Sequence, residues 1–167
     1  MGHAEHKTDA PARVACAVVT VSDTRTPETD TSGRTIREIL EAHGHPVVRY
    51  QIVRDDPDQI RGQLRELAAA PDVQAVLLTG GTGIAPRDHT YDVVAGLLEK
   101  RLDGFGELFR HLSFLEIGSA AMLSRAVGGV LGGKPVFSMP GSAAAARLAT
   151  ERLIAPELGH LMRELRR

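Results

Sequence analysis

Residues 14–21 read VACAVVTV. The run is continuously apolar and rich in β-branched residues, which is typical of a strand buried on both faces of a parallel sheet. Two further strand-like runs follow, VVRYQIV at 47–53 and VQAVLL at 73–78. A sheet buried on both faces needs a layer of helices on each side, so helices are expected between these runs.

Helix signals do separate the three runs. Asp30-Thr31-Ser32 offers N-caps to a helix with apolar residues at helical spacing, and Gly44 suits the position just after its end. Asp56-Pro57-Asp58-Gln59 places a cap, a proline and a glutamine in the order that starts a second helix. The alternation of strand and helix predicts an α/β fold, with a mostly parallel sheet and helices on both faces.

The second half predicts further elements of both kinds. We expect helices around residues 93–98 and 105–112, a helical turn at 119–123, strands at 127–131 and 135–139 linked by two glycines, and a helix from Ser142 that Pro156 breaks or kinks. No repeat or interdomain linker is visible. The chain therefore reads as a disordered tail at 1–12 and a single domain at 13–167.

Composition limits the classes of function. Lys and Arg number 20 against 21 Asp and Glu, a net charge of −1, which argues against broad electrostatic binding of nucleic acid or anionic membrane. No apolar run approaches the length that spans a bilayer. Cys16 is the single cysteine and lies in the first strand, so we expect a buried structural thiol and a cytoplasmic location.

Polar side chains follow each of the first three strands. They are Ser22-Asp23, Asp55-Asp56 and the segment from Gly80 to Asp88. Ligands of open α/β sheets bind outside the carboxyl ends of the strands, where these three segments are expected to meet. The sequence therefore predicts the functional site at this edge.

The segment after the third strand, residues 79–92, reads TGGTGIAPRDHTYD. Gly80, Gly81 and Gly83 leave the backbone open and permit positive φ, so their amides can form an anion-binding nest. Thr79 and Thr82 add hydroxyl donors, Arg87 a cation and Asp88 a carboxylate for a metal. The spacing fits neither a P-loop nor a dinucleotide fingerprint. A tight turn that needs glycine only for packing is the alternative, but the added polar residues favour a binding loop.

Two aspartates suggest a metal site. Either Asp55 or Asp56 caps the following helix, which leaves the other carboxylate available. Mg²⁺ is commonly held by one or two carboxylates together with substrate phosphates. Asp55 and Asp88 therefore form a candidate Mg²⁺ site.

Two other segments have a structural and a functional interpretation. Ser142, in Met139-Pro140-Gly141-Ser142, is either a plain N-cap or part of an anion site at a helix start. Ser124-Arg125 is either an anion-binding pair or a surface pair. The local sequence leaves both alternatives open.

Six motifs occur together in one order, and together they resemble the MoaB/MogA family of molybdenum cofactor biosynthesis. They are TVSDT at 20–24, TGGTG at 79–83, PRD at 86–88, GFGE at 104–107, LSRAV at 123–127 and MPGS at 139–142. The likeness runs from about Val14 to the C-terminus. The segments around GFGE, LSRAV and MPGS are more similar to the MoaB branch than to MogA.

This resemblance implies a three-layer α/β/α sandwich that assembles as a homotrimer or homohexamer. Active members are molybdopterin adenylyltransferases, which use Mg²⁺ and ATP to adenylylate molybdopterin and release pyrophosphate. The key aspartates of the family fall on Asp55 and Asp88, the glycine loop on Gly80–Gly83 and the nucleotide- or pterin-binding junction on Pro140–Ser142. By this likeness the aspartates organise Mg²⁺, while the loop amides and Arg87 stabilise phosphoryl oxygens.

The sequence departs from the family pattern at two positions. Ala144 stands where many members carry Lys, so either Arg125 or Arg147 supplies that cation or the site lacks it. Tyr91 stands where many members carry Pro. Some proteins of the MoaB branch keep the fold without catalysing adenylylation, so the alternative function is a non-catalytic molybdopterin-binding or assembly protein.

Overall fold

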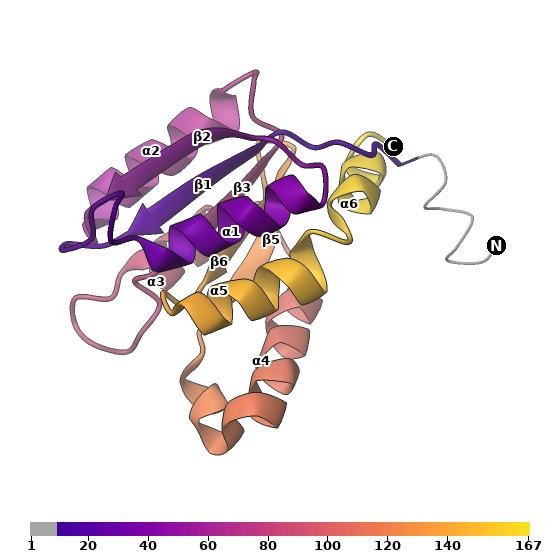
Figure 1. Ribbon diagram of the computed structural model, residues 1–167. Helices are drawn as coiled ribbons and strands as arrows, with labels where there is room; N and C mark the ends of the chain where they lie inside the picture. The colour runs from indigo at the N-terminus through magenta and orange to yellow at the C-terminus, as the bar shows by residue number, and fades with distance from the viewer. Residues whose placement is uncertain (1–9) are drawn as a thin grey trace.

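The computed structural model describes residues 10–167 (Figure 1). The strands are β1 (Cys16–Val21), β2 (Val47–Val53), β3 (Ala75–Thr79), β4 (Lys100–Arg101), β5 (Val127–Leu131) and β6 (Lys134–Met139). The helices are α1 (Thr31–Ala42), α2 (Pro57–Ala69), α3 (Thr90–Leu97), α4 (Asp103–Ile117), α5 (Ala143–Ala149) and α6 (Leu158–Leu165), with a 3₁₀ helix η2 (Gly118–Leu123) and a π-helical turn η3 (Thr150–Ile154).

The six strands form one sheet in the order β2-β1-β3-β6-β5-β4. Strands β2, β1, β3 and β6 are parallel, and β5 is antiparallel to both of its neighbours, β6 and β4. The chain leaves β1 for β2 on one side and returns to β3 on the other side. This reversal makes the carboxyl ends of β1 and β3 the topological switch point, where open α/β sheets form their ligand crevice.

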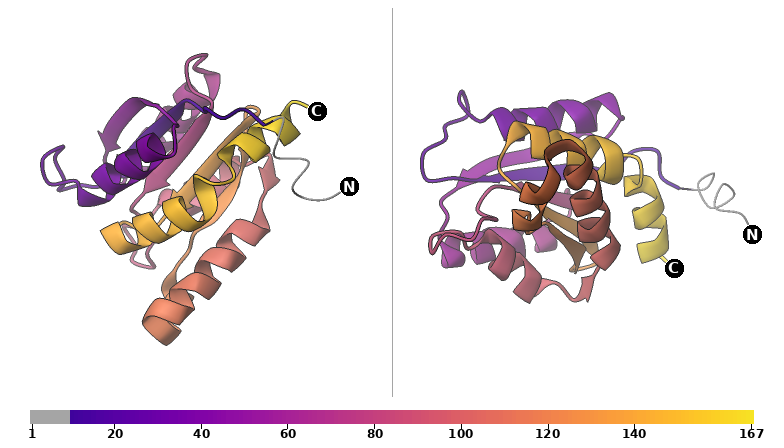
Figure 2. Two further views of the ribbon diagram at one scale, coloured as in Figure 1. Left: turned by 45° about the vertical axis from the view of Figure 1, so that its right-hand side comes forward. Right: turned by 90° about the horizontal axis from the view of Figure 1, so that it is seen from below.

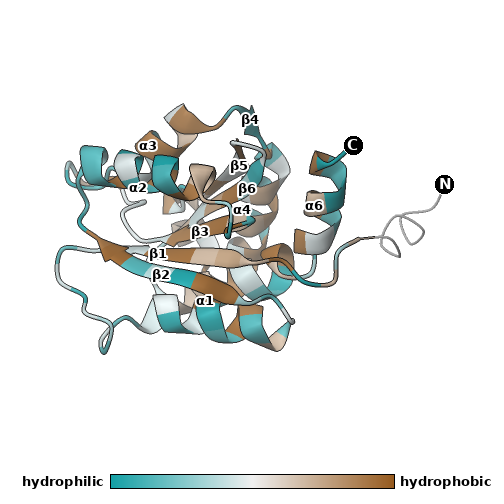
Figure 3. Cartoon of the chain, turned by 90° about the horizontal axis from the view of Figure 1, so that it is seen from above, coloured by the Kyte–Doolittle hydropathy of each residue, from teal (hydrophilic) through white to brown (hydrophobic). Residues whose placement is uncertain are grey.

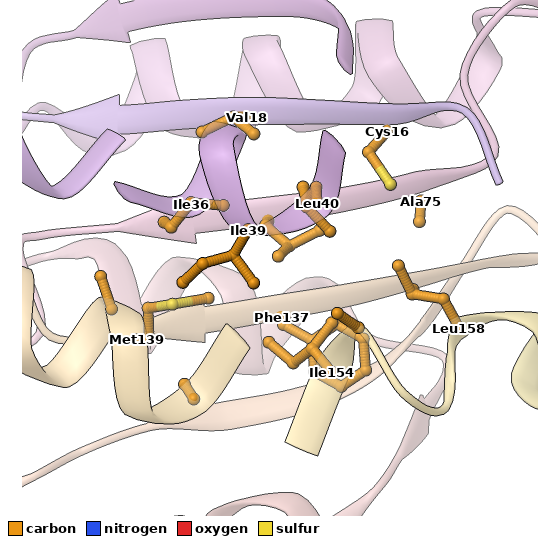
Figure 4. Packing of buried hydrophobic residues seen from close by; sticks show 14 of the residues in the cluster. Cys16, Val18, Ile36, Ile39, Leu40, Ala75, Phe137, Met139, Ile154 and Leu158 are labelled. Carbon is orange, nitrogen blue, oxygen red and sulfur yellow. The ribbon is translucent and has the colours of Figure 1, made fainter. Parts of the chain in front are cut away.

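Helices cover both faces of the sheet, as predicted. Alternate residues of β1 show why, because Cys16 and Val18 belong to one buried core while Ala17 and Val19 belong to the other. The first core packs beneath α1, α4, α5 and α6, and the second beneath α2 and α3. Figure 4 shows part of the first core, with Ile39 and Leu40 of α1 beside side chains of β1 and β6. The fold is therefore the expected α/β/α sandwich.

Hydropathy follows these layers. Figure 3 shows β1 and β3 coloured as hydrophobic over most of their length, whereas the edge strand β2 is mixed and α1 carries hydrophilic colour on its outer side. All residues of β1 and β3 are buried, and none of β2 is. Within residues 10–167, no helix is long and apolar enough to cross a bilayer.

The caps that were predicted from the sequence start the first two helices. Asp30 accepts a 2.9 Å hydrogen bond from the amide of Gly33, and Asp56 accepts one of 2.9 Å from the amide of Gln59, with Pro57 as the first residue of α2. Gly44 follows α1 with φ 83°. Of the two adjacent aspartates, Asp56 therefore caps α2, and the carboxylate of Asp55 is not used as a cap.

Several boundaries differ from the predictions. The first and third strands start at Cys16 and Ala75, because Val14 donates its amide to the ring of His45 and Val73 closes a turn onto Ala70. The short strand β4 was not predicted, since its two residues are exposed and carry no strand pattern. The C-terminal helix is divided by η3, and Pro156 lies in the turn before α6. Most of the predicted tail, residues 1–9, lies outside the described residues, so that prediction remains untested.

Candidate functional site

The carboxyl ends of β1, β3 and β6 meet at Gly80. A Cβ atom on Gly80 would lie 2.3 Å from the carbonyl oxygen of Val21, and one on Gly141 would lie 3.1 Å from the Cα of Gly80. The amide of Gly80 donates a 3.0 Å hydrogen bond to the carbonyl of Met139. With φ at 98°, Gly80 also has a backbone conformation that L side chains avoid. The approach of the three strand ends therefore depends on glycine.

The amides available to a ligand begin one residue later. Those of Gly81, Thr82 and Gly83 donate to no acceptor within residues 10–167, whereas the amide of Gly80 is held by β6. Gly81 has φ 68°, and the chain turns there away from β3. Three consecutive unpaired amides form a ready anion-binding concavity. The predicted nest is thus narrower than the sequence implied, because Gly80 belongs to the scaffold.

Two carboxylates lie directly against this loop. A Cβ on Gly81 would lie 2.6 Å from Oδ2 of Asp55, and a Cβ on Gly83 would lie 2.5 Å from Oδ2 of Asp88. The amide of His89 donates to Oδ1 of Asp55 at 3.1 Å, and the amide of Ala85 donates to Oδ2 of Asp88 at 3.0 Å. The two glycines therefore make room for carboxylates as well as exposing amides.

The electrostatics of Asp55 reflect this crowding. Partial burial raises its pKa, and the negative charges of Asp88 and Asp23 raise it further, while the amide and the ring charge of His89 act in the opposite direction. Oδ2 of Asp55 accepts no hydrogen bond in the described part of the chain. A cation at this point would relieve the repulsion among the carboxylates.

Arginines tie the loop to neighbouring segments. Arg87 pairs with Asp23, which in turn accepts a 3.2 Å hydrogen bond from the amide of Asp55. Arg125 donates to the carbonyl of Gly83 at 3.0 Å and to Asp92 at 2.6 Å, and its guanidinium lies over the ring of Tyr91. Arg125 thus holds residues 124–125 against the glycine loop, but the positive charge of Arg125 is balanced by Asp92.

The predicted hydroxyl groups have different roles in the described part of the chain: Thr79 donates within the protein, whereas Ser22 and Ser142 accept from backbone amides and keep an O–H that can donate. Thr79 is fully buried and donates to the carbonyl of Pro140 at 3.0 Å. Thr82 is also buried. Ser142 accepts a 3.1 Å hydrogen bond from the amide of Ala145, which confirms the cap. Ser22 accepts hydrogen bonds from the amides of Thr24 and Arg25 and so shapes the turn after β1.

Three cavities follow one another along this edge. The smallest, here called the crevice, has a volume of about 210 Å³ and lies at the switch point between Ser22, Ser32, Gly80 and Gly141. The β2 cavity, of about 480 Å³, adjoins it at Ser22 and runs beside the edge strand. The α4 cavity, of about 220 Å³, contains Ser124, Pro140 and Ser142 together with apolar residues of α4 and α5.

Two residues at this edge were not singled out from the sequence. Arg25 lines both the crevice and the β2 cavity. The sequence feature that could have identified Arg25 is its position, as a cation two residues after Ser22-Asp23. The hydroxyl of Thr90 is buried, has no hydrogen-bond partner in the described part of the chain, and lies 2.1 Å from the position that a Cβ on Gly81 would occupy. Nothing in the local sequence distinguished Thr90 from an ordinary helix residue.

The donor set suits a hard divalent cation that is also held by its substrate. No group of three His, Cys, Asp or Glu side chains within residues 10–167 is arranged to hold a metal ion. Asp55 and Asp88 instead offer oxygen atoms on two sides of the unpaired amides. One or two carboxylates combined with phosphate oxygens are the usual ligands of Mg²⁺, so the residues fit that ion.

Comparisons with known proteins agree on one family. Residues 17–160 match the family described as "Probable molybdopterin binding domain". A relative from Halalkalibacterium halodurans, named molybdenum cofactor biosynthesis protein B, is 56% identical over 162 residues, which are 96% of this chain and 95% of the relative.

Solved structures give the same result. A crystal structure of a molybdenum cofactor biosynthesis protein B is 54% identical, with a TM-score of 0.91, over 94% of this chain and 98% of the other. The tungsten cofactor synthesizing protein MoaB from Pyrococcus furiosus is 37% identical, with a TM-score of 0.84, over 95% of this chain and 100% of the other.

Proposed function

The chain belongs to the molybdenum cofactor biosynthesis protein B family, and we propose that it is a molybdopterin adenylyltransferase. The proposed reaction transfers AMP from MgATP to the terminal phosphate of molybdopterin. The observation that carries the proposal is the placement of Asp55 and Asp88 against Gly81 and Gly83, on two sides of three unpaired amides.

The proposed reaction requires the alignment of two anions more than it requires a proton acceptor. A phosphate monoester has a second pKa near 6, so most of the nucleophile is already dianionic at pH 7. One of its oxygens forms a bond to the α-phosphorus of ATP, and the bond from that phosphorus to the bridging oxygen breaks to release pyrophosphate. The protein must therefore hold two anions together and neutralise charge at the α-phosphate.

The residues of the site suit these tasks. The amides of Gly81, Thr82 and Gly83 would donate to phosphoryl oxygens. Asp55 and Asp88 would hold Mg²⁺, which when bound supplies positive charge to the phosphates. Arg87 would join them once a phosphate competes with Asp23 for its guanidinium.

We propose further that the chain forms a homotrimer or homohexamer. Six apolar side chains of α4 and η2 are each more than half exposed, and we call them the α4–η2 surface: Leu108, Phe114, Leu115, Ile117, Met122 and Leu123. Figure 2 shows α4 and η2 extending beyond the other helices. Apolar patches of this kind on a soluble protein mark association surfaces.

An assay of product formation tests the proposed activity. Purified protein is mixed with molybdopterin and MgATP, and both adenylylated molybdopterin and pyrophosphate are measured. Asp88→Asn is expected to lower turnover at least about 100-fold with little change in pterin affinity, because charge stabilisation in the transition state is lost. Asp58→Asn is the matched control, since Asp58 is an exposed aspartate in the first turn of α2.

The alternative is a binding protein without catalytic activity. It predicts that molybdopterin binds while neither adenylylated product nor pyrophosphate appears. Equal turnover of Asp88→Asn and the unmodified protein would instead contradict the proposed role of the carboxylate pair.

A further inference from the structure

The crevice contains a positive charge without a counter-charge. Arg25 is the only charged residue among those described as lining it, and none of the others is acidic. The side chain of Arg25 donates to the carbonyl of Thr29 at 3.0 Å, and it forms no ion pair within residues 10–167. A cation paired only with a neutral carbonyl retains most of its attraction for an anion.

The remaining groups of the crevice limit what that anion can be. The hydroxyl of Thr79 donates to the carbonyl of Pro140, and the hydroxyl of Ser32 donates to Oδ1 of Asp30 at 3.3 Å. The amide of Gly81 donates to no acceptor in the described part of the chain. The amide of Gly141 is likewise unpaired within residues 10–167, and the hydroxyl of Ser22, which accepts from two amides, can still donate. Beside these neutral donors, Arg25 offers the guanidinium nitrogens that do not contact Thr29. A fork of nitrogens beside a backbone amide suits a phosphoryl group, which accepts several hydrogen bonds at once.

The other arginines near the loop are already balanced by carboxylates. Arg87 pairs with Asp23 and Arg125 with Asp92. Arg147 lies on the exposed side of α5, more than a turn beyond the cap Ser142. An anion in the crevice would therefore meet Arg25 first, without having to break an existing ion pair.

We propose that Arg25 is the phosphate-binding cation of the crevice. The ligand is a phosphate ester whose phosphoryl group lies between Arg25 and the amide of Gly81. Its organic part extends into the β2 cavity, which shares Ser22 and Arg25 with the crevice and has room for a ring system. The inference deepens the proposed function and rests on it for the identity of the ligand, but the site itself is defined by the contacts above.

The test uses inorganic pyrophosphate as the probe and the full chain as the protein. Calorimetric titration gives the dissociation constant for the unmodified protein, Arg25→Gln and Arg25→Lys. Loss of charge-assisted hydrogen bonds is expected to weaken binding about 10- to 100-fold in Arg25→Gln. Arg25→Lys keeps the positive charge but lacks the two parallel N–H donors of a guanidinium, so its affinity is expected to lie between those of the unmodified protein and Arg25→Gln. Raising the salt concentration should weaken binding to the unmodified protein more than to Arg25→Gln.

Arg34→Gln is the matched control. Arg34 also donates to a carbonyl of the β1–α1 loop, that of Glu28, at 2.9 Å, but it does not line the crevice. Its variant is expected to bind pyrophosphate as the unmodified protein does. Equal losses in both variants would mean that Arg25 only supports the loop, which would overturn the proposal. Thermal melting of each variant establishes that the fold is retained.

The remaining outcomes separate this proposal from the proposed function. Unchanged pyrophosphate affinity in Arg25→Gln, or no measurable binding to the unmodified protein, overturns the role of Arg25 even if adenylylation is observed. Selective loss of affinity in Arg25→Gln supports that role even if the unmodified protein forms no adenylylated product.

Discussion

The hydroxyl of Tyr50 donates a 2.5 Å hydrogen bond to Oδ2 of Asp30, which joins the edge strand β2 to the cap of α1. The same oxygen accepts a 2.6 Å bond from Thr20 of β1, and Asp30 is fully buried. Asp30 thus fixes the far end of the loop that carries Ser22 and Arg25. A buried carboxylate with several donors stabilises a fold only while those donors are present.

Tyr50→Phe is expected to lower the free energy of unfolding by about 1.5–3 kcal/mol, the usual contribution of a hydrogen bond to a charged group. Tyr91→Phe is the control, because the Tyr91 hydroxyl accepts from Arg101 at the surface, and its loss should change stability by less than about 0.5 kcal/mol. Urea denaturation at pH 7 measures both. Equal effects would contradict the importance of the Asp30 network.

The cost of Tyr50→Phe is also expected to depend on pH. Burial by itself raises the pKa of Asp30, but hydrogen bonds from Thr20, Tyr50, Gly33 and Ser32 together bring it below its ordinary value. A lowered folded pKa stabilises the protein above the unfolded pKa of about 3.9, and this stabilisation is lost as pH falls through the folded pKa. The difference between Tyr50→Phe and the unmodified protein should therefore shrink in strongly acidic denaturation experiments.

His45 makes the stability of the fold depend on pH closer to neutrality than Asp30 does. Its Nδ1 accepts from the amide of Val14 at 3.1 Å, and its Nε2 lies 3.1 Å from the carbonyl of Ala155, so the ring suits the neutral form. Burial lowers its pKa, and the charge of His43 lowers it further, against the effect of the Ala155 carbonyl. The stabilisation is complete above about pH 6.5 and is lost as pH falls through the folded pKa.

The melting temperature is therefore expected to fall on acidification below about pH 6.5, and His45→Gln should remove part of that slope. His111→Gln, at an exposed position on α4, is the control. Differential scanning calorimetry between pH 5 and 8, about the range in which histidine titrates, measures the slopes. Identical slopes in all three proteins would contradict the assignment to His45.

Gly81→Ala is expected to disrupt the site. The new Cβ would lie 2.1 Å from Oγ1 of Thr90 and 2.6 Å from Oδ2 of Asp55, and φ 68° is unfavourable for alanine. The strain of the positive φ alone costs about 1–2 kcal/mol. Gly62→Ala is the control within α2, where nothing lies within 4 Å of the added atom, and it should stabilise by about 0.5–1 kcal/mol. Opposite signs in urea denaturation are expected; a neutral Gly81→Ala would contradict the close packing.

A charge on the α4–η2 surface is expected to prevent assembly. Leu115 and Met122 are 68% and 77% exposed, so Leu115→Glu and Met122→Glu should leave the fold of a single chain intact. Sedimentation velocity should show the unmodified protein as an oligomer and these variants as monomers, because burying an unpaired charge is costly. Val48→Glu, on the edge strand β2, is the control. A monomeric unmodified protein would end the assembly hypothesis.

The layers of the fold, and the edge of the sheet at which the candidate site lies, can be predicted from the sequence alone. Continuous apolar runs and short-range caps such as Asp30 and Asp56 depend on local physics, so they can be read along the chain. The order of the strands and the short β4 could not be read in this way, because β4 forms only through its pairing with β5.

Which groups at that edge remain available to a ligand depends on tertiary contacts. No local pattern separates Gly80 from Gly81, yet the amide of Gly80 donates to Met139 while that of Gly81 has no acceptor within residues 10–167. The expected cations were Arg87 and either Arg125 or Arg147. Arg87 and Arg125 have carboxylate partners 64 and 33 residues away along the chain, whereas Arg25 has none within residues 10–167. Charge balance depends on such distant neighbours, and only folding brings them together.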